Sequence, residues 1–189
     1  MKYTKTDALL CLKDCKTLLD EYTIPSWDEL PTIDLYMDQV IELVNRYLGL
    51  LLLFSGENGE ITRPMINNYV KLKMMPAPVK KKYSRVHLAY IIVICTLKQS
   101  LNISTIQKIL PIEISEEDVK TIYNSFAKNQ RAAFDYIAKQ ADSVAAPILS
   151  AEDAALNQID DLIIQVASSA NILKCLTEKI VSYQEKESK

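Results

Sequence analysis

Glycine and histidine are scarce in this sequence: there are three glycines and one histidine among 189 residues. Because short strands joined by tight turns depend on glycine, a mostly helical protein is expected. Three glycines are also too few for a phosphate-binding loop, and no nucleotide-binding, zinc-protease or serine-hydrolase motif occurs. His87 has no evident partner with which to form a catalytic site. We therefore expect a protein that is not an enzyme and that needs no cofactor.

Long apolar runs and metal-ligand spacings are missing as well. No stretch of 18 apolar residues occurs, so no membrane span is expected, and the first residues lack the features of a secretory signal. The four cysteines, Cys11, Cys15, Cys95 and Cys175, form no CxxC pair, and a single histidine cannot complete a metal site with them. They are typical of reduced thiols in a cytoplasmic protein.

The charges are segregated along the chain, although the net charge is only −2. Residues 1–60 carry 5 basic and 11 acidic side chains, a net charge of −6. Residues 61–112 carry 9 basic side chains and no acidic one, a net charge of +9. Residues 113–189 carry 8 basic and 13 acidic side chains, a net charge of −5. Seven of the nine basic residues lie between Arg63 and Arg85. A solvated basic face is one interpretation, but the absence of acids favours a surface that attracts phosphate groups.

Apolar periodicity predicts an all-α fold with one small β element. The expected helices cover 7–22, 33–53, 61–75, 84–97, 104–110 and 115–140, with a break at Pro147 and a last helix from Ser150. Ile66, Tyr69 or Val70, and Met74 are the expected buried residues of the helix over 61–75. The basic segment 79–83 predicts a hairpin or wing.

The last helix, expected over 151–184, has apolar residues at heptad spacing. The residues expected to form a dimer contact are Ile159, Leu162, Val166, Leu173, Leu176 and Ile180. Side chains seven apart share one helix face, so this helix can pair with that of a second copy as a coiled coil. A helix that lies on its own domain is equally compatible with the pattern.

The order of helix, basic wing, apolar helix and short helix between residues 62 and 110 resembles the MerR-type winged helix-turn-helix of bacterial transcription regulators. The recognition helix of that family is matched by residues 65–69, and its wing by residues 81–84. Lys73 stands where the family has a turn glycine. The resemblance implies a DNA-binding domain over 32–112, preceded by a helix and linker (1–31) and followed by a helical region (113–189).

The chain is also similar to an uncharacterised family of Gram-positive bacteria that is known only as a domain of unknown function. Segments 25–31, 36–40 and 65–71 carry this similarity, which covers about residues 25–130. The DNA-binding assignment of that family is an inference from its fold.

Together, charge and resemblance predict a sequence-specific transcriptional regulator that binds double-stranded DNA as a homodimer. Helix 63–75 would enter the major groove, where asparagine can pair with adenine and arginine or lysine with guanine or phosphate, and wing 79–85 would contact the backbone. For Asn67 and Asn68, simple surface polarity is the competing interpretation. Tyr83 is expected to pack the wing and to offer its hydroxyl to a phosphate. The candidate contact residues are Arg63, Asn67, Asn68, Lys71, Lys80, Lys81, Lys82, Tyr83 and Arg85.

Two other functions remain open from the sequence. One is a protein–protein adaptor that keeps a MerR-like scaffold and presents its basic face to an acidic partner. The other is a small-molecule sensor whose ligand lies between the helix over 115–140 and the N-terminal helices, although no cluster of polar residues supports it. The sequence does not identify a small-molecule effector.

Overall fold

The computed structural model describes residues 6–187 except 8, 9, 11, 12, 15, 18, 19, 21, 55–59 and 151–155. The chain divides into two compact units. The central unit is Thr23–Gln130, and the terminal unit combines Met1–Tyr22 with Arg131–Lys189. The boundaries expected after residues 31 and 112 both lie inside the central unit.

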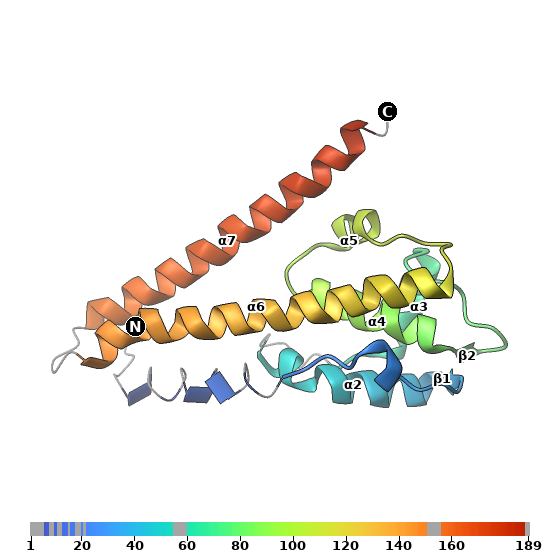
Figure 1. The fold of residues 1–189 in the computed structure, drawn as a ribbon, viewed down its shortest axis with the longest axis horizontal. Helices are drawn as coiled ribbons and strands as arrows, with labels where there is room; N and C mark the ends of the chain where they lie inside the picture. The colour runs from blue at the N-terminus through green and yellow to red at the C-terminus, as the bar shows by residue number, and fades with distance from the viewer. Residues whose placement is uncertain are drawn as a thin grey trace. The chain divides into compact units, whose positions relative to one another are not determined.

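The fold is mostly helical with one small sheet, as the scarcity of glycine predicts (Figure 1). In chain order the elements are the 3-10 turn η1 (Trp27–Glu29), β1 (Leu35–Tyr36), α2 (Met37–Phe54), α3 (Arg63–Lys71), β2 (Lys82–Tyr83), α4 (Arg85–Leu97), α5 (Ile103–Ile109), α6 (Glu116–Ser150) and α7 (Leu156–Glu187).

Helix α4 is the core of the central unit. All ten residues from His87 to Thr96 are buried, so this helix is covered on every side. Helix α2 packs against it and buries Val40, Val44 and Leu48, which recur every four residues and are 0% exposed. The two apolar helices expected over 33–53 and 84–97 are therefore confirmed.

The segment before β1 is docked onto the first half of α6. The ring of Trp27 meets that of Tyr123 edge-on with centroids 6.3 Å apart, and the Tyr123 hydroxyl donates to the Pro25 carbonyl at 2.8 Å. The Trp27 N–H donates to Asn124 Oδ1 at 3.0 Å. These contacts join residues 25–30 to the first part of α6, which explains why the central unit includes both.

The predicted wing, residues 79–85, pairs with a strand from an earlier part of the chain. β2 pairs antiparallel with β1, with Leu35 opposite Tyr83 and Tyr36 opposite Lys82. The helix expected from residue 33 therefore begins at Met37, because the residues before it extend as a strand. The sequence could not indicate this pairing, since the two strands lie far apart along the chain.

Helix α6 is longer than the sequence predicts. It continues through Pro147 to Ser150, so the expected break at this proline is wrong. A proline within a helix removes one N–H donor and disturbs the preceding turn, and only three residues of α6 follow this one. Helix α7 begins at Leu156, not at Ser150, and residues 151–155 between them lie outside the described part of the chain.

In the terminal unit, Tyr22 packs on Phe134 with ring centroids 5.0 Å apart. Arg131 donates to the carbonyls of Asp20 and Tyr22 at 3.3 Å and pairs with Asp135 at 2.7 Å. The described residues between 6 and 20 are helical, which agrees with the helix expected over 7–22. Four leucines and two cysteines of this segment lie outside the described residues: Leu9, Leu12, Leu18, Leu19, Cys11 and Cys15.

Candidate nucleic-acid interface

Helix α3, the expected recognition helix, is seated on the core by its inner face. Ile66 and Tyr69 are buried, at 0% and 3% exposure. The Tyr69 hydroxyl lies 3.8 Å from Cys95 Sγ of α4, and burial raises the pKa of that thiol to about 11. Cys95 is therefore an uncharged packing residue, as expected from the sequence, and α3 has a fixed inner side.

Two amide side chains hold the ends of α3. Asn45 of α2 receives the Ile61 N–H at 2.7 Å and donates to the Ile61 carbonyl at 3.3 Å, just before the helix begins. Gln107 of α5 donates to the Leu72 carbonyl at 2.9 Å, just after it ends. Sequence reasoning missed both residues, because a lone amide carries no motif that reveals a distant backbone partner.

The helix ends at Lys71, earlier than the expected residue 75, and Lys73 is the reason. Lys73 has a φ of 54°, in the left-handed region, and its N–H bonds to the Val70 carbonyl at 3.0 Å. The next N–H, that of Met74, bonds to the Tyr69 carbonyl at 2.9 Å, which completes a Schellman motif. Met74 is 0% exposed, so the expected buried residues are confirmed although the helix is shorter.

The outer face of α3 carries the predicted polar residues. Arg63, Asn67 and Lys71 recur every four residues, Asn68 lies beside them, and all four are exposed. Arg63 is not alone on this face, because its guanidinium pairs with Asp38 of α2. Both of these side chains are largely exposed, so the ion pair is weak and can be exchanged for a phosphate contact.

The wing presents two lysines at its tip. Lys80 and Lys81 have φ angles of 50° and 63°, and the turn they form is closed by the Lys82 N–H bonding to the Val79 carbonyl at 2.9 Å. Two successive positive φ angles are typical of a type I′ hairpin turn, in which asparagine and glycine are the usual residues. Both lysines are exposed, so this strained turn projects two cations into solvent.

The base of the wing is packed. The ring of Tyr83 is 3% exposed and meets His87 edge-on with centroids 5.5 Å apart, so the predicted anchoring role is seen. This burial leaves little of Tyr83 accessible to a ligand. Lys82 is partly exposed, and its Nζ lies 5.4 Å from the centroid of the Tyr36 ring.

Arg85 is placed differently from the prediction. Its side chain is 16% exposed, lies 5.5 Å from the Trp27 ring, and donates to the Leu30 carbonyl at 2.8 Å. Asp28 Oδ1 is 4.0 Å away. The predicted phosphate contact is therefore replaced by a structural role, in which Arg85 joins the start of α4 to η1. Tertiary packing, which the sequence did not show, removes this cation from the candidate interface.

The structure adds Lys73 to the candidate residues. It is exposed just beyond the end of α3. The sequence could have indicated this residue, because it lies in the acid-free segment and stands where the MerR family has a turn glycine. The candidate interface is therefore defined by Arg63, Asn67, Asn68, Lys71, Lys73, Lys80, Lys81 and Lys82. We call this set the basic face.

The predicted dimer stripe of α7 is exposed where the structure describes it. Val166, Leu173, Leu176 and Ile180 are 53–58% exposed. The one apolar residue of α7 described as buried, Val181, is on a different face of the helix. The side-chain surroundings of Ile159 and Leu162 are not among those described.

The described residues contain neither a metal-binding cluster nor a membrane-spanning helix. No group of three or more histidine, cysteine, aspartate or glutamate side chains there is arranged to hold a metal ion. Within the same residues, no helix combines the length and apolar character needed to cross a membrane.

Comparison with known protein families identifies a match over the central part of the chain. The family model described as "Domain of unknown function (DUF1836)" matches residues 25–126, close to the range expected from the sequence. No curated protein and no solved structure matches the chain. The matched range runs from the segment before η1 into α6 and contains the whole basic face. Because it covers more than half of the 189 residues, the chain belongs to the DUF1836 family.

Proposed function

We propose that this protein is a sequence-specific regulator of transcription that binds double-stranded DNA in the manner of a MerR-type winged helix-turn-helix. Helix α3 would lie in the major groove, and the hairpin over 79–82 would contact the flanking backbone. The observation that carries the proposal is the turn at Lys80 and Lys81, where two cations occupy backbone conformations that favour glycine or asparagine.

Strained backbone is found most often where function requires it. A turn that served the fold alone would be more stable with asparagine and glycine at these two positions. Lysine at both positions is instead consistent with a need for positive charge at the tip. Phosphate contacts from such a tip would supply affinity and orientation, and they would carry no sequence information.

The outer face of α3 offers the chemistry for reading bases. An asparagine amide can donate to and accept from adenine at once, so Asn67 and Asn68 are suited to direct readout. Arg63 and Lys71 can contact guanine or phosphate on either side of them. The seated inner face and the two amide clamps, Asn45 and Gln107, support this role because they fix the orientation of α3.

The proposal includes a homodimer formed through α7, a cytoplasmic location and no enzymatic activity. Dimeric helix-turn-helix proteins bind two half-sites about one helical turn of DNA apart, so their affinity depends on the pairing of the subunits. The exposed heptad stripe on α7 supports pairing with a second copy.

The test is a fluorescence anisotropy titration with labelled duplex DNA at 50 and 200 mM salt. The variant Lys80→Asn/Lys81→Gly keeps the preferences of the turn and removes its charge. We expect the variant to bind about 5- to 30-fold more weakly for each bound subunit, from roughly 0.5–1 kcal/mol for each exposed contact. Its slope of log K against log salt should be less steep by about 1.8 for each bound subunit, because each subunit loses two phosphate contacts.

The control is Lys128→Gln/Lys139→Gln, which removes the same charge from exposed positions on α6. This variant should keep nearly the wild-type affinity. If genomic fragments do not bind at either salt concentration, or if both double variants bind equally well, the proposal is wrong. Sequence readout is tested by Asn67→Ala, which should cost about 1–3 kcal/mol at a selected site and little on random DNA.

A second candidate is an adaptor whose basic face binds an acidic protein. It is favoured by exposed apolar side chains on the elements of the wing: Tyr36 is 56% exposed and Val79 is 68% exposed. Interfaces with DNA are more polar than interfaces between proteins. Recovery of an acidic protein with no nucleic acid, and loss of that capture in Val79→Ser, would favour the adaptor over the DNA-binding regulator.

A further inference from the structure

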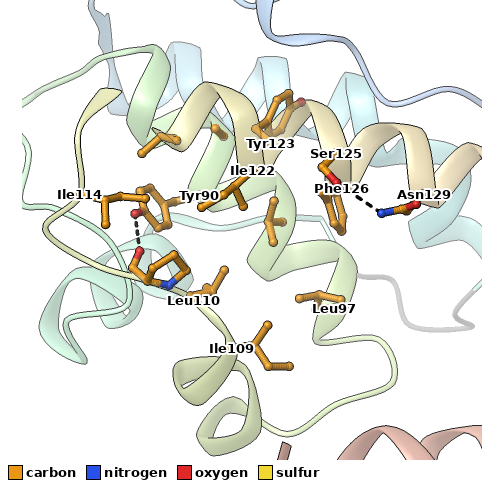
Figure 2. A pocket seen from close by; sticks show the side chains of 14 residues that line it. Tyr90, Leu97, Ile109, Leu110, Ile114, Ile122, Tyr123, Ser125, Phe126 and Asn129 are labelled. Carbon is orange, nitrogen blue, oxygen red and sulfur yellow. Dashed lines mark hydrogen bonds between the residues drawn. The ribbon is translucent and has the colours of Figure 1, made fainter. Parts of the chain in front are cut away.

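The central unit contains a cavity on the side of α4 that faces away from α3. It is bounded by α4, the first half of α6 and the segment from Ile109 to Ile114, and its volume is about 260 Å³ (Figure 2). All of its lining residues belong to the central unit. It differs from the ligand site considered from the sequence, which was placed between the helix over 115–140 and the N-terminal helices.

The lining determines the kind of molecule that could bind. It is dominated by aliphatic side chains and by three aromatic rings, those of Tyr90, Tyr123 and Phe126, and it includes no charged side chain. Moving an ionised group into such surroundings without a partner is strongly unfavourable. A neutral molecule with flat apolar faces is therefore suited to this cavity.

The volume indicates how large a molecule the cavity can hold. An apolar cavity of about 150 Å³ is large enough to hold benzene. A cavity of about 260 Å³ accordingly has room for two fused rings. Two of the wall residues, Ile109 and Ile122, are 37% and 44% exposed, and a bound molecule would remove part of this apolar surface from water.

The polar groups of the cavity make hydrogen bonds of different strength within the protein. The Tyr90 hydroxyl donates to the Pro111 carbonyl at 2.6 Å, so it is held by the protein itself. Asn129 Nδ2 donates to Ser125 Oγ at 3.4 Å, which is long for a hydrogen bond (Figure 2). This weak bond on α6 can be exchanged for one to a ligand. The two side chains offer a donor and an acceptor to a single hydroxyl group.

We propose that this cavity binds a neutral two-ring aromatic molecule with one hydroxyl group, its rings between α4 and α6 and its hydroxyl at Ser125 and Asn129. The inference does not depend on the proposed binding of DNA, because it follows from the cavity alone.

The experiment is isothermal titration calorimetry of the full chain with 2-naphthol, naphthalene and 2-naphthoate as probes. We expect 2-naphthol to bind with a Kd below 1 mM and 2-naphthoate to bind at least tenfold more weakly, because it is charged. Asn129→Ala should weaken 2-naphthol by about 2- to 10-fold and leave naphthalene unchanged, as expected for one hydrogen bond.

The blocking variant is Ile122→Trp, which adds bulk to the cavity wall from a partly exposed position, so the fold should tolerate it. It should abolish binding of 2-naphthol, whereas the matched control Ile33→Trp, at a 68% exposed position outside the cavity, should not. A thermal melt checks that both variants fold. Absence of 2-naphthol binding to the wild type, equal binding of 2-naphthoate, or unchanged binding to Ile122→Trp would each overturn the proposal. No DNA is present, so these outcomes say nothing about the proposed regulator.

Discussion

At the scale of single residues, three lysines hold backbone conformations that usually favour glycine. Lys73, Lys80 and Lys81 have φ angles of 54°, 50° and 63°. For a residue with a Cβ atom, this conformation costs roughly 1–2 kcal/mol. The positions are not equivalent, however. Lys73 ends a helix whose buried face continues beyond it, whereas Lys80 and Lys81 form a tip that has only solvent around it.

The strain at Lys73 makes a prediction about stability. Lys73→Gly should raise the free energy of unfolding by about 0.5–1 kcal/mol. Glycine relieves the strain in the folded state, and the greater flexibility that it gives the unfolded chain offsets part of this gain. The matched control is Lys71→Gly, which removes a neighbouring lysine from the helix and should lower stability by about 1 kcal/mol. Urea unfolding measures both. Equal destabilisation by the two substitutions would show that Lys73 is not strained.

His87 is a structural residue at the start of α4. Its Nδ1 accepts the Ser84 N–H at 3.0 Å, so Nδ1 carries no proton, and Nε2 faces the Ala77 carbonyl at 3.3 Å. Burial lowers the pKa of this imidazole below its usual value, although the Ala77 carbonyl and Asp34 act in the opposite direction. The neutral form is therefore the one that joins α4 to the segment before the wing.

This arrangement predicts a dependence of stability on pH. Between the lowered pKa of the folded state and the usual value of about 6.5, the unfolded chain binds the proton and the folded chain does not. The free energy of unfolding should therefore fall as the pH is lowered from 7.5 to 5.5. His87→Gln keeps a side chain that can cap Ser84 and does not titrate. Urea unfolding at both pH values should show a smaller change in this variant, and an identical change would contradict the assignment.

At the scale of elements, α2 influences the basic face through one carboxylate. Asp38 pairs with Arg63 and competes with any phosphate for its guanidinium. Asp38→Asn should raise the affinity for DNA by about 2- to 5-fold, as expected for a surface ion pair. The slope of log K against log salt should steepen by about 0.9 for each bound subunit, because one more phosphate contact becomes available in each. Anisotropy titration measures both values, and Glu42→Gln, at an exposed position on the same helix, is the control.

The sequence predicted those features of the elements that depend on local pattern. The spacing of Ile66 and Tyr69 indicated the buried side of α3, since a helix repeats its facing residues every three or four positions. It could not indicate that Leu35 extends as a strand or that Arg85 is held by Trp27. Both depend on partners distant in sequence. The basic face was therefore identified as a segment, but its membership required the structure.

At the scale of the whole molecule, the chain combines a central unit that carries the candidate interface with a helix suited to pairing. Residues Val166, Leu173, Leu176 and Ile180 of α7 are all more than half exposed although they are apolar. Exposed apolar residues at heptad spacing mark an interaction surface more often than they mark solvent contact. Pairing of two copies would cover this stripe and bring two basic faces into one particle.

The oligomeric state tests this arrangement. By analytical ultracentrifugation the wild type should have twice the 21.4 kDa mass of one chain, whereas Leu173→Asp should be a monomer, because a charge at the centre of the stripe is unfavourable in an apolar contact. Asn171→Asp adds the same charge to an exposed position off the stripe and should remain dimeric. If the regulator binds two half-sites, Leu173→Asp should also weaken binding to a two-site fragment far more than to a single half-site. A monomeric wild type would contradict pairing through α7, and the candidate interface of the central unit would then bind DNA as a single copy.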